Sequence, residues 1–363
     1  MSAPEPPRPA ARLSGLTAYR PSRAGGPGAA RMHANEGRAP PVTLGPALEA
    51  VDPALYPDAG PLEARLAASF GVAPEQVMVT AGADDALARI ALALLEPGRS
   101  AALLEPTFEM IPRYVQIAGG APRPVPWMGG AFPLEPFLEA LDGASVGFLV
   151  TPSSPAGQVI PLDALHRAAD RARASGGLLV VDLAYVEFAE VDPTEALLSR
   201  GDVVVTRTFS KALGLAGLRV GYVMGPRAVV EWLRAVGQPF AVGSLSLAAA
   251  SAVVDERRAI AERARARVRA ERARIGQVLA SSGAEVLPSE ANFVLARWPE
   301  DLGRAGRWAE ALAKVGFRVR AFGAGALDGY LRISCPQDEA VLDRFLDAAR
   351  RIAQDPDQGA IDR

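Results

Sequence analysis

Lysine is nearly missing from this chain of 363 residues. Lys211 and Lys314 are its only lysines, which leaves 37 arginines among the 39 basic residues. Arginine covers a solvated surface as well as lysine does, but its guanidinium stays protonated and cannot act as a neutral amine. A lysine retained in such a chain is therefore a candidate for chemistry that needs a primary amine.

Cysteine and histidine are equally scarce. Cys335 is the single cysteine and cannot form an internal disulfide, which is typical of a protein of the reducing cytoplasm. His33 and His166 lie far apart without cysteine partners, so we expect no metal site. No G-x-S-x-G sequence is present, which argues against a serine hydrolase with a nucleophile elbow.

The chain also lacks a charge surplus and a long apolar run. A net charge of −2 argues against nucleic-acid binding, which needs excess positive charge. The longest apolar run, at residues 244–254, is shorter than the roughly 18 residues of a membrane span, so no membrane association is expected. Residues 1–10 are proline-rich without an apolar stretch, so we interpret them as a disordered lead rather than a secretory signal.

Short β-rich segments alternate with helical patterns from residue 76 onward. The predicted strands span residues 76–80, 101–104, 146–150, 178–181, 203–206 and 218–224, the predicted helices span 83–95 and 162–174, and a further helix begins near Phe108. This alternation predicts an α/β fold with a mostly parallel sheet covered on both faces. Ligands of such sheets bind beyond the carboxyl ends of the strands.

The pattern changes after about residue 243. Residues 255–276 form a predicted helix rich in arginine, with interleaved glutamates and one apolar face, which favours an amphipathic surface helix over a nucleic-acid-binding one. Strands at 292–296, 317–320 and 330–334 and helices at 306–315 and 337–352 follow. We therefore predict an N-terminal arm (1–44) that joins a small α+β domain (246–363), and a large domain between them (45–245).

The two lysines have different surroundings. Lys314 lies in the last turn of a predicted helix, where a cation complements the helix dipole. Lys211 instead follows a predicted strand, close in sequence to Thr208, Ser210 and Arg219. Two hydroxyls and a guanidinium can hold a phosphate dianion, and an amine beside them suits Schiff-base chemistry.

Two further segments complete a candidate cofactor site. The turn at residues 80–85 contains Gly82, so that the amides of Ala83 and Asp84 at a helix N-terminus can approach a phosphate; Asp84 is also a candidate helix cap. Asp182 ends a buried strand and needs a partner, which the pyridinium N–H of pyridoxal phosphate (PLP) can provide. Tyr185 follows Asp182 by three positions, so its hydroxyl is a candidate hydrogen-bond partner for the ring hydroxyl O3′.

In its motifs the chain resembles the fold-type I PLP-dependent aminotransferases of class I/II, and within them the histidinol-phosphate aminotransferases. The similarity runs nearly from end to end. The segments that carry it are Gly15–Tyr19, His33–Glu36, Leu55–Asp58, Thr80–Asp85, Pro106–Phe108, Thr151–Gly157, Ser210–Lys211 with Leu218–Arg219, Arg320, and Leu331–Ser334.

The resemblance implies a role for each matched residue. Catalytic roles fall on Lys211, Asp182 and Tyr185. The implied PLP ligands are Ala83, Asp84, Phe108, Ser154, Asp182, Tyr185, Thr208, Ser210, Lys211 and Arg219, together with Tyr56, which reaches the neighbouring site of a homodimer. Tyr19, Asn35, Arg320 and Arg332 are implied to bind substrate.

The activity implied is a two-stage transamination from a small-molecule amino donor to a 2-oxo acid, in which Lys211 transfers the proton. Histidinol phosphate and 2-oxoglutarate are the expected substrates, as in histidine biosynthesis. Serine at Ser154, where relatives carry asparagine, and Leu183 in place of glutamate are departures from the family pattern. They keep three alternatives open: an aromatic amino-acid aminotransferase, a decarboxylase or other PLP enzyme acting on a phosphorylated amino acid, and a non-catalytic PLP-binding module.

Overall fold

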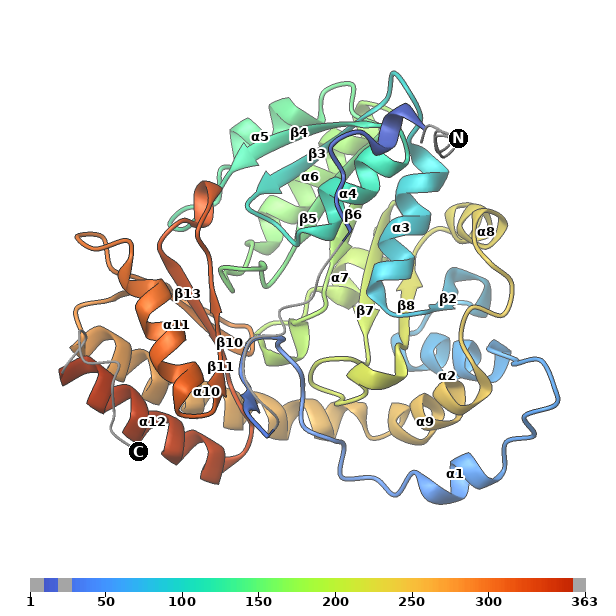
Figure 1. Ribbon diagram of the computed structural model, residues 1–363. Helices are drawn as coiled ribbons and strands as arrows, with labels where there is room; N and C mark the ends of the chain where they lie inside the picture. Colours follow the sequence, from blue (N-terminus) through green and yellow to red (C-terminus); the bar gives the residue numbers. More distant parts are fainter. Residues whose placement is uncertain (1–9, 19–27, 355–363) are drawn as a thin grey trace, which may run out of the picture.

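The computed structural model describes residues 10–18 and 28–354, which form two main β-sheets with helices packed on them (Figure 1). The expectation for the N-terminal lead falls almost entirely on residues 1–9, and Tyr19 also lies outside the described residues. Within the described part, no helix combines the length and apolar character needed to cross a membrane.

The large sheet has seven strands in the order β2-β8-β7-β6-β5-β3-β4. Its strands are β2 (Val77–Thr80), β3 (Ser100–Glu105), β4 (Ala121–Pro126), β5 (Val146–Val150), β6 (Leu178–Asp182), β7 (Val203–Thr208) and β8 (Gly221–Met224). Strand β8 runs opposite to the other six, so its pairings with β2 and β7 are antiparallel and the remaining pairings are parallel. The predicted α/β class with a mostly parallel sheet is confirmed.

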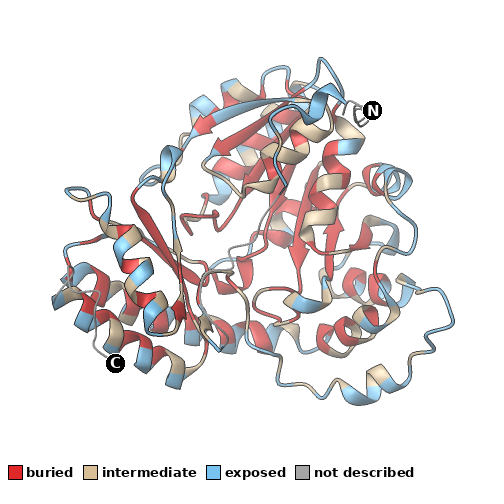
Figure 2. Ribbon diagram, in the orientation of Figure 1, coloured by how far each residue is buried: buried red, intermediate tan, exposed pale blue. Residues whose placement is uncertain are grey.

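Helices cover both faces of the large sheet, because its strands place successive apolar side chains on opposite faces. Apolar residues of α2 (Gly60–Phe70), α5 (Leu134–Leu141), α6 (Leu162–Ala174) and α9 (Ser244–Val254) form the core on one face. Those of α3 (Ala83–Leu94), α4 (Met110–Ile117) and α8 (Arg227–Val236) form the core on the other. Most strands between these layers are buried, as Figure 2 shows, whereas the edge strand β4 is largely exposed.

Two strand predictions need correction in this half. Strand β4 was not predicted, because Pro122, Pro124 and Pro126 argue against a strand; it lies at the sheet edge, where proline is tolerated. Strand β8 begins at Gly221 rather than at residue 218, because Ala216–Leu218 forms a 3₁₀ turn and Arg219 adopts a left-handed backbone with φ 51°.

The small sheet has four strands in the order β12-β13-β10-β9. They are β9 (Glu285–Val286), β10 (Phe293–Arg297), β12 (Arg320–Ala321) and β13 (Tyr330–Ser334), and α10 (Arg257–Ser281), α11 (Arg304–Lys314) and α12 (Glu339–Gln354) contribute to the same core. A separate pair joins β1 (Ala30–Arg31) to β11 (Phe317–Arg318). The strand predicted at 317–320 is therefore two short strands, β11 and β12, in different sheets.

The N-terminal segment associates with the small sheet, because β1 pairs with β11 and Met32 belongs to the small-sheet core. Short helices α1 (Gly45–Glu49) and α7 (Thr194–Leu198) complete the large-sheet half. Helix α10 begins against the large-sheet core at Ile260 and continues into the small-sheet core at Ala264. The exact domain boundaries at 44 and 245 stay a prediction.

Candidate active site

A cavity of about 1330 Å³ is lined by the carboxyl-end edge of the large sheet, by the small sheet and by the N-terminal segment. Most of the predicted site residues line it: Asn35, Ala83, Asp84, Phe108, Ser154, Asp182, Tyr185, Thr208, Ser210, Lys211, Arg219, Arg320 and Arg332. Tyr56 is not among the lining residues; its side chain is 81 % exposed and stacks on Phe240.

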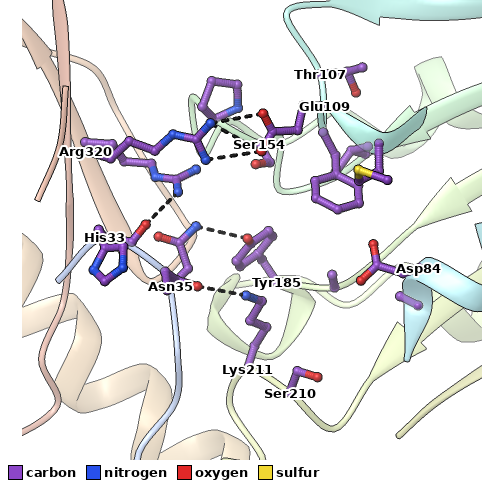
Figure 3. Close-up of a pocket in the computed structure, with 18 of the residues that line it drawn as sticks. His33, Asn35, Asp84, Thr107, Glu109, Ser154, Tyr185, Ser210, Lys211 and Arg320 are labelled. Carbon is purple, nitrogen blue, oxygen red and sulfur yellow. Dashed lines mark hydrogen bonds and ion pairs between the residues drawn. The ribbon is translucent and has the colours of Figure 1, made fainter. Parts of the chain in front are cut away.

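Lys211 lies just beyond the end of β7 and points into the cavity (Figure 3). Its amine donates a hydrogen bond to the backbone carbonyl of Ala34 at 3.4 Å and lies 5.4 Å from the ring centroid of Tyr185. Within the described residues it forms no ion pair with a carboxylate.

Asp182 is the last residue of β6 and is buried in the floor of the cavity. Burial raises the pKa of its carboxyl group to about 6, although the hydroxyl of Thr206 donates a hydrogen bond to Oδ1 at 2.7 Å and opposes this shift. No cation of the described residues pairs with it. A cationic N–H partner would stabilise the ionised form of this buried carboxylate.

Tyr185 belongs to a hydrogen-bond chain that connects the two sheets. Its hydroxyl accepts a hydrogen bond from Nδ2 of Asn35 at 3.0 Å, and Oδ1 of Asn35 accepts one from the hydroxyl of Ser334 at 2.7 Å. The backbone N–H of Asn35 donates a second hydrogen bond to the hydroxyl oxygen of Ser334 at 3.0 Å. Asn35, on the N-terminal segment, is thereby fixed against β13 and orients the tyrosine toward the cavity.

The phosphate-binding groups predicted from the sequence meet in one corner. Arg219 donates to the hydroxyl of Ser210 at 3.2 Å and pairs with Asp84 at 3.0 Å, and the backbone N–H of Ser210 donates to the hydroxyl of Thr208 at 3.0 Å. Burial raises the pKa of Asp84, an effect opposed by Arg219, and its other oxygen is buried without a hydrogen-bond partner.

The turn before α3 keeps this corner open. Gly82 occupies the N-cap position with φ 83°, and a Cβ there would lie 2.6 Å from Nη2 of Arg219. The prediction of Asp84 as helix cap is wrong, because no side chain caps α3. The carboxylate of Asp85 instead accepts the backbone N–H of Ala81 at 3.0 Å. The first amides of α3, which have no partner within the helix, remain available to an anion.

The other side of the cavity is rich in arginine. Arg320 on β12 and Arg332 on β13 are direct partners in the antiparallel register, and both line the cavity. Arg332 donates to the backbone carbonyl of His33 at 3.0 Å, whereas Arg320 pairs with Glu109 at 3.0 Å. A patch of this charge suits a substrate anion.

Sequence reasoning missed several lining residues, among them Arg31, His33, Arg113, Arg318 and Glu109. Burial and the nearby arginines Arg31, Arg318 and Arg332 lower the pKa of His33. The Arg-Val-Arg pattern of residues 318–320 was a usable signal, since alternate residues of an extended segment share one face. Nothing local to the sequence around Glu109 indicated that its carboxylate meets Arg320.

Comparison with known proteins identifies the family. The family model for aminotransferases of class I and II matches residues 47–348. The chain belongs to this family. It is 39 % identical over 277 residues (75 % of this chain and 74 % of the relative) to a histidinol-phosphate aminotransferase of Halorubrum lacusprofundi. It is 34 % identical over 350 residues (93 % and 96 %) to an aromatic amino acid aminotransferase of Mycolicibacterium vanbaalenii.

A solved structure points the same way. The crystal structure of histidinol-phosphate aminotransferase from Sinorhizobium meliloti in complex with pyridoxal-5′-phosphate superposes with a TM-score of 0.80 at 28 % identity, over 90 % of this chain and 91 % of that one. The chain is thus a PLP-dependent aminotransferase of class I and II, with amino-acid and oxo-acid substrates.

The residues present in this aminotransferase fit PLP. Asp182 is a buried carboxylate without a cationic partner among the described residues, as the pyridine N–H requires. The phosphate fits the corner of Arg219, Ser210 and the first amides of α3, which Gly82 leaves open. The amine of Lys211 lies in the same cavity, so covalent attachment needs no distant group. Among the described residues, no cluster of His, Cys, Asp and Glu is suited to a metal ion.

Proposed function

We propose that this aminotransferase transfers the amino group of histidinol phosphate to 2-oxoglutarate. One observation carries the proposal: Arg320 and Arg332 face each other across β12 and β13 in the cavity wall. Like charges placed directly opposite on neighbouring strands repel each other, and an anion beside them relieves this repulsion, as Glu109 does at Arg320. A phosphate ester in one stage and a dicarboxylate in the other would bring further anionic groups to the two arginines.

The relatives support this choice without excluding a second one. Several similar proteins are named histidinol-phosphate aminotransferases, including the S. meliloti structure. Transamination of aromatic amino acids is the second candidate, because the M. vanbaalenii relative aligns over 93 % of this chain. The aromatic side chains of Phe108 and Phe322 in the cavity wall would suit its substrates.

Several residues of the cavity would bind the cofactor and take part in proton transfer. PLP, when bound, supplies an aldehyde for Schiff-base formation with amines and a ring that accepts electrons. Lys211 would bind it covalently, and its freed amine would then move the proton between the substrate Cα and C4′ of the cofactor. Asp182 would accept the N–H of the ring nitrogen. Ser154 and Tyr185 would orient O3′, and Phe108 would pack on the ring.

The remaining residues would position ligands. Arg219, Thr208, Ser210 and the amides of Ala83 and Asp84 would hold the cofactor phosphate. Arg332, with Arg320, would bind the substrate anion. Asn35 would act through Tyr185, to which it donates a hydrogen bond. Tyr19 keeps its predicted substrate-binding role as a proposal from sequence.

We further propose a homodimer in which Tyr56 completes the partner's site. The tyrosine is highly exposed and absent from the cavity of its own chain. It stacks on Phe240, itself 58 % exposed, with ring centroids 4.6 Å apart. Two adjacent exposed aromatic rings are typical of a surface buried on association. A cytoplasmic location stays a prediction.

The donor can be tested in a single half-reaction. The PLP form of the enzyme is mixed separately with histidinol phosphate, phenylalanine, tyrosine and phosphothreonine, and conversion of the cofactor to its amino form is followed by absorbance. We expect the highest apparent second-order rate with histidinol phosphate. Absence of conversion with this donor, alongside conversion with phenylalanine or tyrosine, would refute the first proposal and favour the second.

A further inference from the structure

Arg320, one of the arginines that line the cavity, is paired with a carboxylate. Nη2 of Arg320 lies 3.0 Å from Oε2 of Glu109, and both terminal nitrogens of the guanidinium lie 3.3 Å from Oε1 (Figure 3). Glu109 directly precedes α4 of the large-sheet half, and Arg320 begins β12 of the small sheet. The ion pair therefore crosses the cavity wall between the two halves.

Each member of the pair also has a favourable interaction within its own half of the molecule. Glu109 lies at the N-terminus of α4, where the helix dipole favours an anion. The guanidinium of Arg320 lies over the ring of Phe322, 4.8 Å from its centroid. Each charge therefore has favourable surroundings in addition to the ion pair.

Solvent nevertheless reaches the pair. The side chain of Arg320 is 30 % exposed and that of Glu109 is 41 % exposed, and both line the cavity. Ion pairs this accessible contribute little net stability, because water and salt compete for each charge. A substrate anion in the cavity can therefore exchange with Glu109 at a modest cost.

We propose that Glu109 is a specificity-determining residue that competes with the second anionic group of a substrate for Arg320. This inference rests on the anion-binding role proposed above for Arg320, and does not depend on which amine is the donor. A ligand with one carboxylate can bind without disturbing the pair. A ligand with two anionic groups must displace Glu109 from Arg320 and tolerate its negative charge nearby.

The consequence is discrimination by charge number. Specificity is a difference between two affinities, and a fixed like charge lowers only one of them. Glu109 thus weakens the binding of ligands with two anionic groups, such as dicarboxylates, relative to ligands with one. Because it leaves Arg320 in place, the site still accepts a doubly charged ligand such as 2-oxoglutarate.

Glutarate and pentanoate provide the direct test, since they have the same chain length and differ in one carboxylate. Their binding to the PLP-loaded enzyme is measured by calorimetry at low ionic strength, where screening is least. We expect Glu109→Gln to bind glutarate up to about fivefold more tightly, the upper end of the range for an exposed ion pair. Pentanoate affinity should not change.

Three comparisons complete the design. Glu285→Gln, which breaks a similar ion pair with Arg297 at 2.8 Å outside the cavity, should leave both affinities unchanged. In an Arg320→Gln background, Glu109→Gln should lose its effect on glutarate, as a double-mutant cycle requires. In steady-state kinetics, Glu109→Gln should lower KM for 2-oxoglutarate, but not for pyruvate, with little change in kcat.

Three results would overturn the inference: unchanged or weaker glutarate binding in Glu109→Gln, an equal change for both ligands, or the same gain without Arg320. These outcomes are separable from the donor assignment, because neither glutarate nor pentanoate reacts. An enzyme inactive with histidinol phosphate can still show the glutarate-specific gain, and an enzyme active with it can fail to show the gain.

Discussion

Each half of the molecule buries a carboxylate whose pKa is raised to near neutrality, but only one of the two faces the cavity. Asp182 ends β6 in the large-sheet half, and burial raises its pKa to about 6. Glu271 lies on α10 in the small-sheet half, and burial raises its pKa to about 7. The same physical cause therefore acts at two sites with different surroundings.

The surroundings separate function from packing. Asp182 lines the same cavity as Lys211, and a bound cation can offset the free-energy cost of burying its charge. Glu271 accepts the backbone N–H of Gln337 at 2.9 Å, and its other oxygen is buried without a hydrogen-bond partner. It lies beside Cys335, whose pKa burial also raises, and outside the lining of the cavity. A perturbed carboxylate indicates a functional site only when a ligand can reach it.

The largest effect is expected at Lys211, another cavity residue of the large-sheet half. Lys211→Arg keeps the charge and removes the neutral amine, so transamination should fall by at least about 10³-fold. The spectrum of covalently bound PLP should disappear with it. Lys314→Arg, at the end of α11, is the matched control and should keep both. An active Lys211→Arg enzyme would refute the role of Lys211 as the PLP-binding and proton-transferring residue.

In the small-sheet half, a substitution at Arg332 should weaken substrate binding without removing PLP. Arg332→Gln removes a buried cation from the cavity wall, so kcat/KM should fall roughly 10- to 100-fold, the range for a lost charge-assisted hydrogen bond. The PLP spectrum should remain. Arg297→Gln, on β10 outside the cavity, should change neither quantity. Equal losses in the two variants would contradict an anion-binding role for Arg332.

The two halves also differ in how far sequence predicts them. The cofactor side follows from local motifs, because Asp182, Thr208 and the turn at Gly82 each lie at the carboxyl end of a strand, and parallel strands bring these ends together. The helix at residues 162–174 was predicted with its observed bounds. Lys211 was identifiable from its neighbours alone.

The substrate side depends on contacts that no local pattern encodes. Arg320 meets Arg332 only because β12 and β13 pair in one register, and it meets Glu109 across 211 positions of sequence. The change of sheet between Arg318 and Arg320 was also invisible, because two extended residues on either side read as one strand. Tertiary pairing, rather than propensity, decides these positions.

The pH dependence of PLP binding tests the role of Asp182. A raised carboxyl pKa means that the cofactor-free protein holds a proton there below about pH 6. Pairing with the ring N–H requires the ionised form, so affinity should fall up to about tenfold per pH unit below that value. Absorbance titrations with PLP between pH 5 and 8 measure it.

Two variants isolate this titration from that of PLP itself. Asp182→Asn should bind PLP more weakly at neutral pH and lose the dependence near pH 6. Thr206→Val removes the hydroxyl that stabilises the ionised carboxylate, so the midpoint should move to higher pH. A midpoint unaffected by both substitutions would assign the dependence to another group.

The smallest effect is expected at Glu271, and it concerns stability rather than binding. Its pKa rises from an ordinary value of 4.5 to about 7 in the fold, so the folded state binds more protons between these values and stability falls as pH rises through them. Glu271→Gln removes this dependence and retains an oxygen that can accept the N–H of Gln337. The variant should therefore match the parent near pH 5 and exceed its unfolding free energy by roughly 1–2 kcal/mol above pH 7.

Denaturant unfolding at pH 5 and pH 8 measures this difference, with the exposed Glu285→Gln as a control that should show none. Transamination at neutral pH should be unaffected by Glu271→Gln, since this residue does not line the cavity. If Glu271→Gln instead lowers activity as Asp182→Asn does, the two carboxylates are not separated by access to ligand. The small-sheet half would then contribute a titrating group to the reaction as well as an anion site.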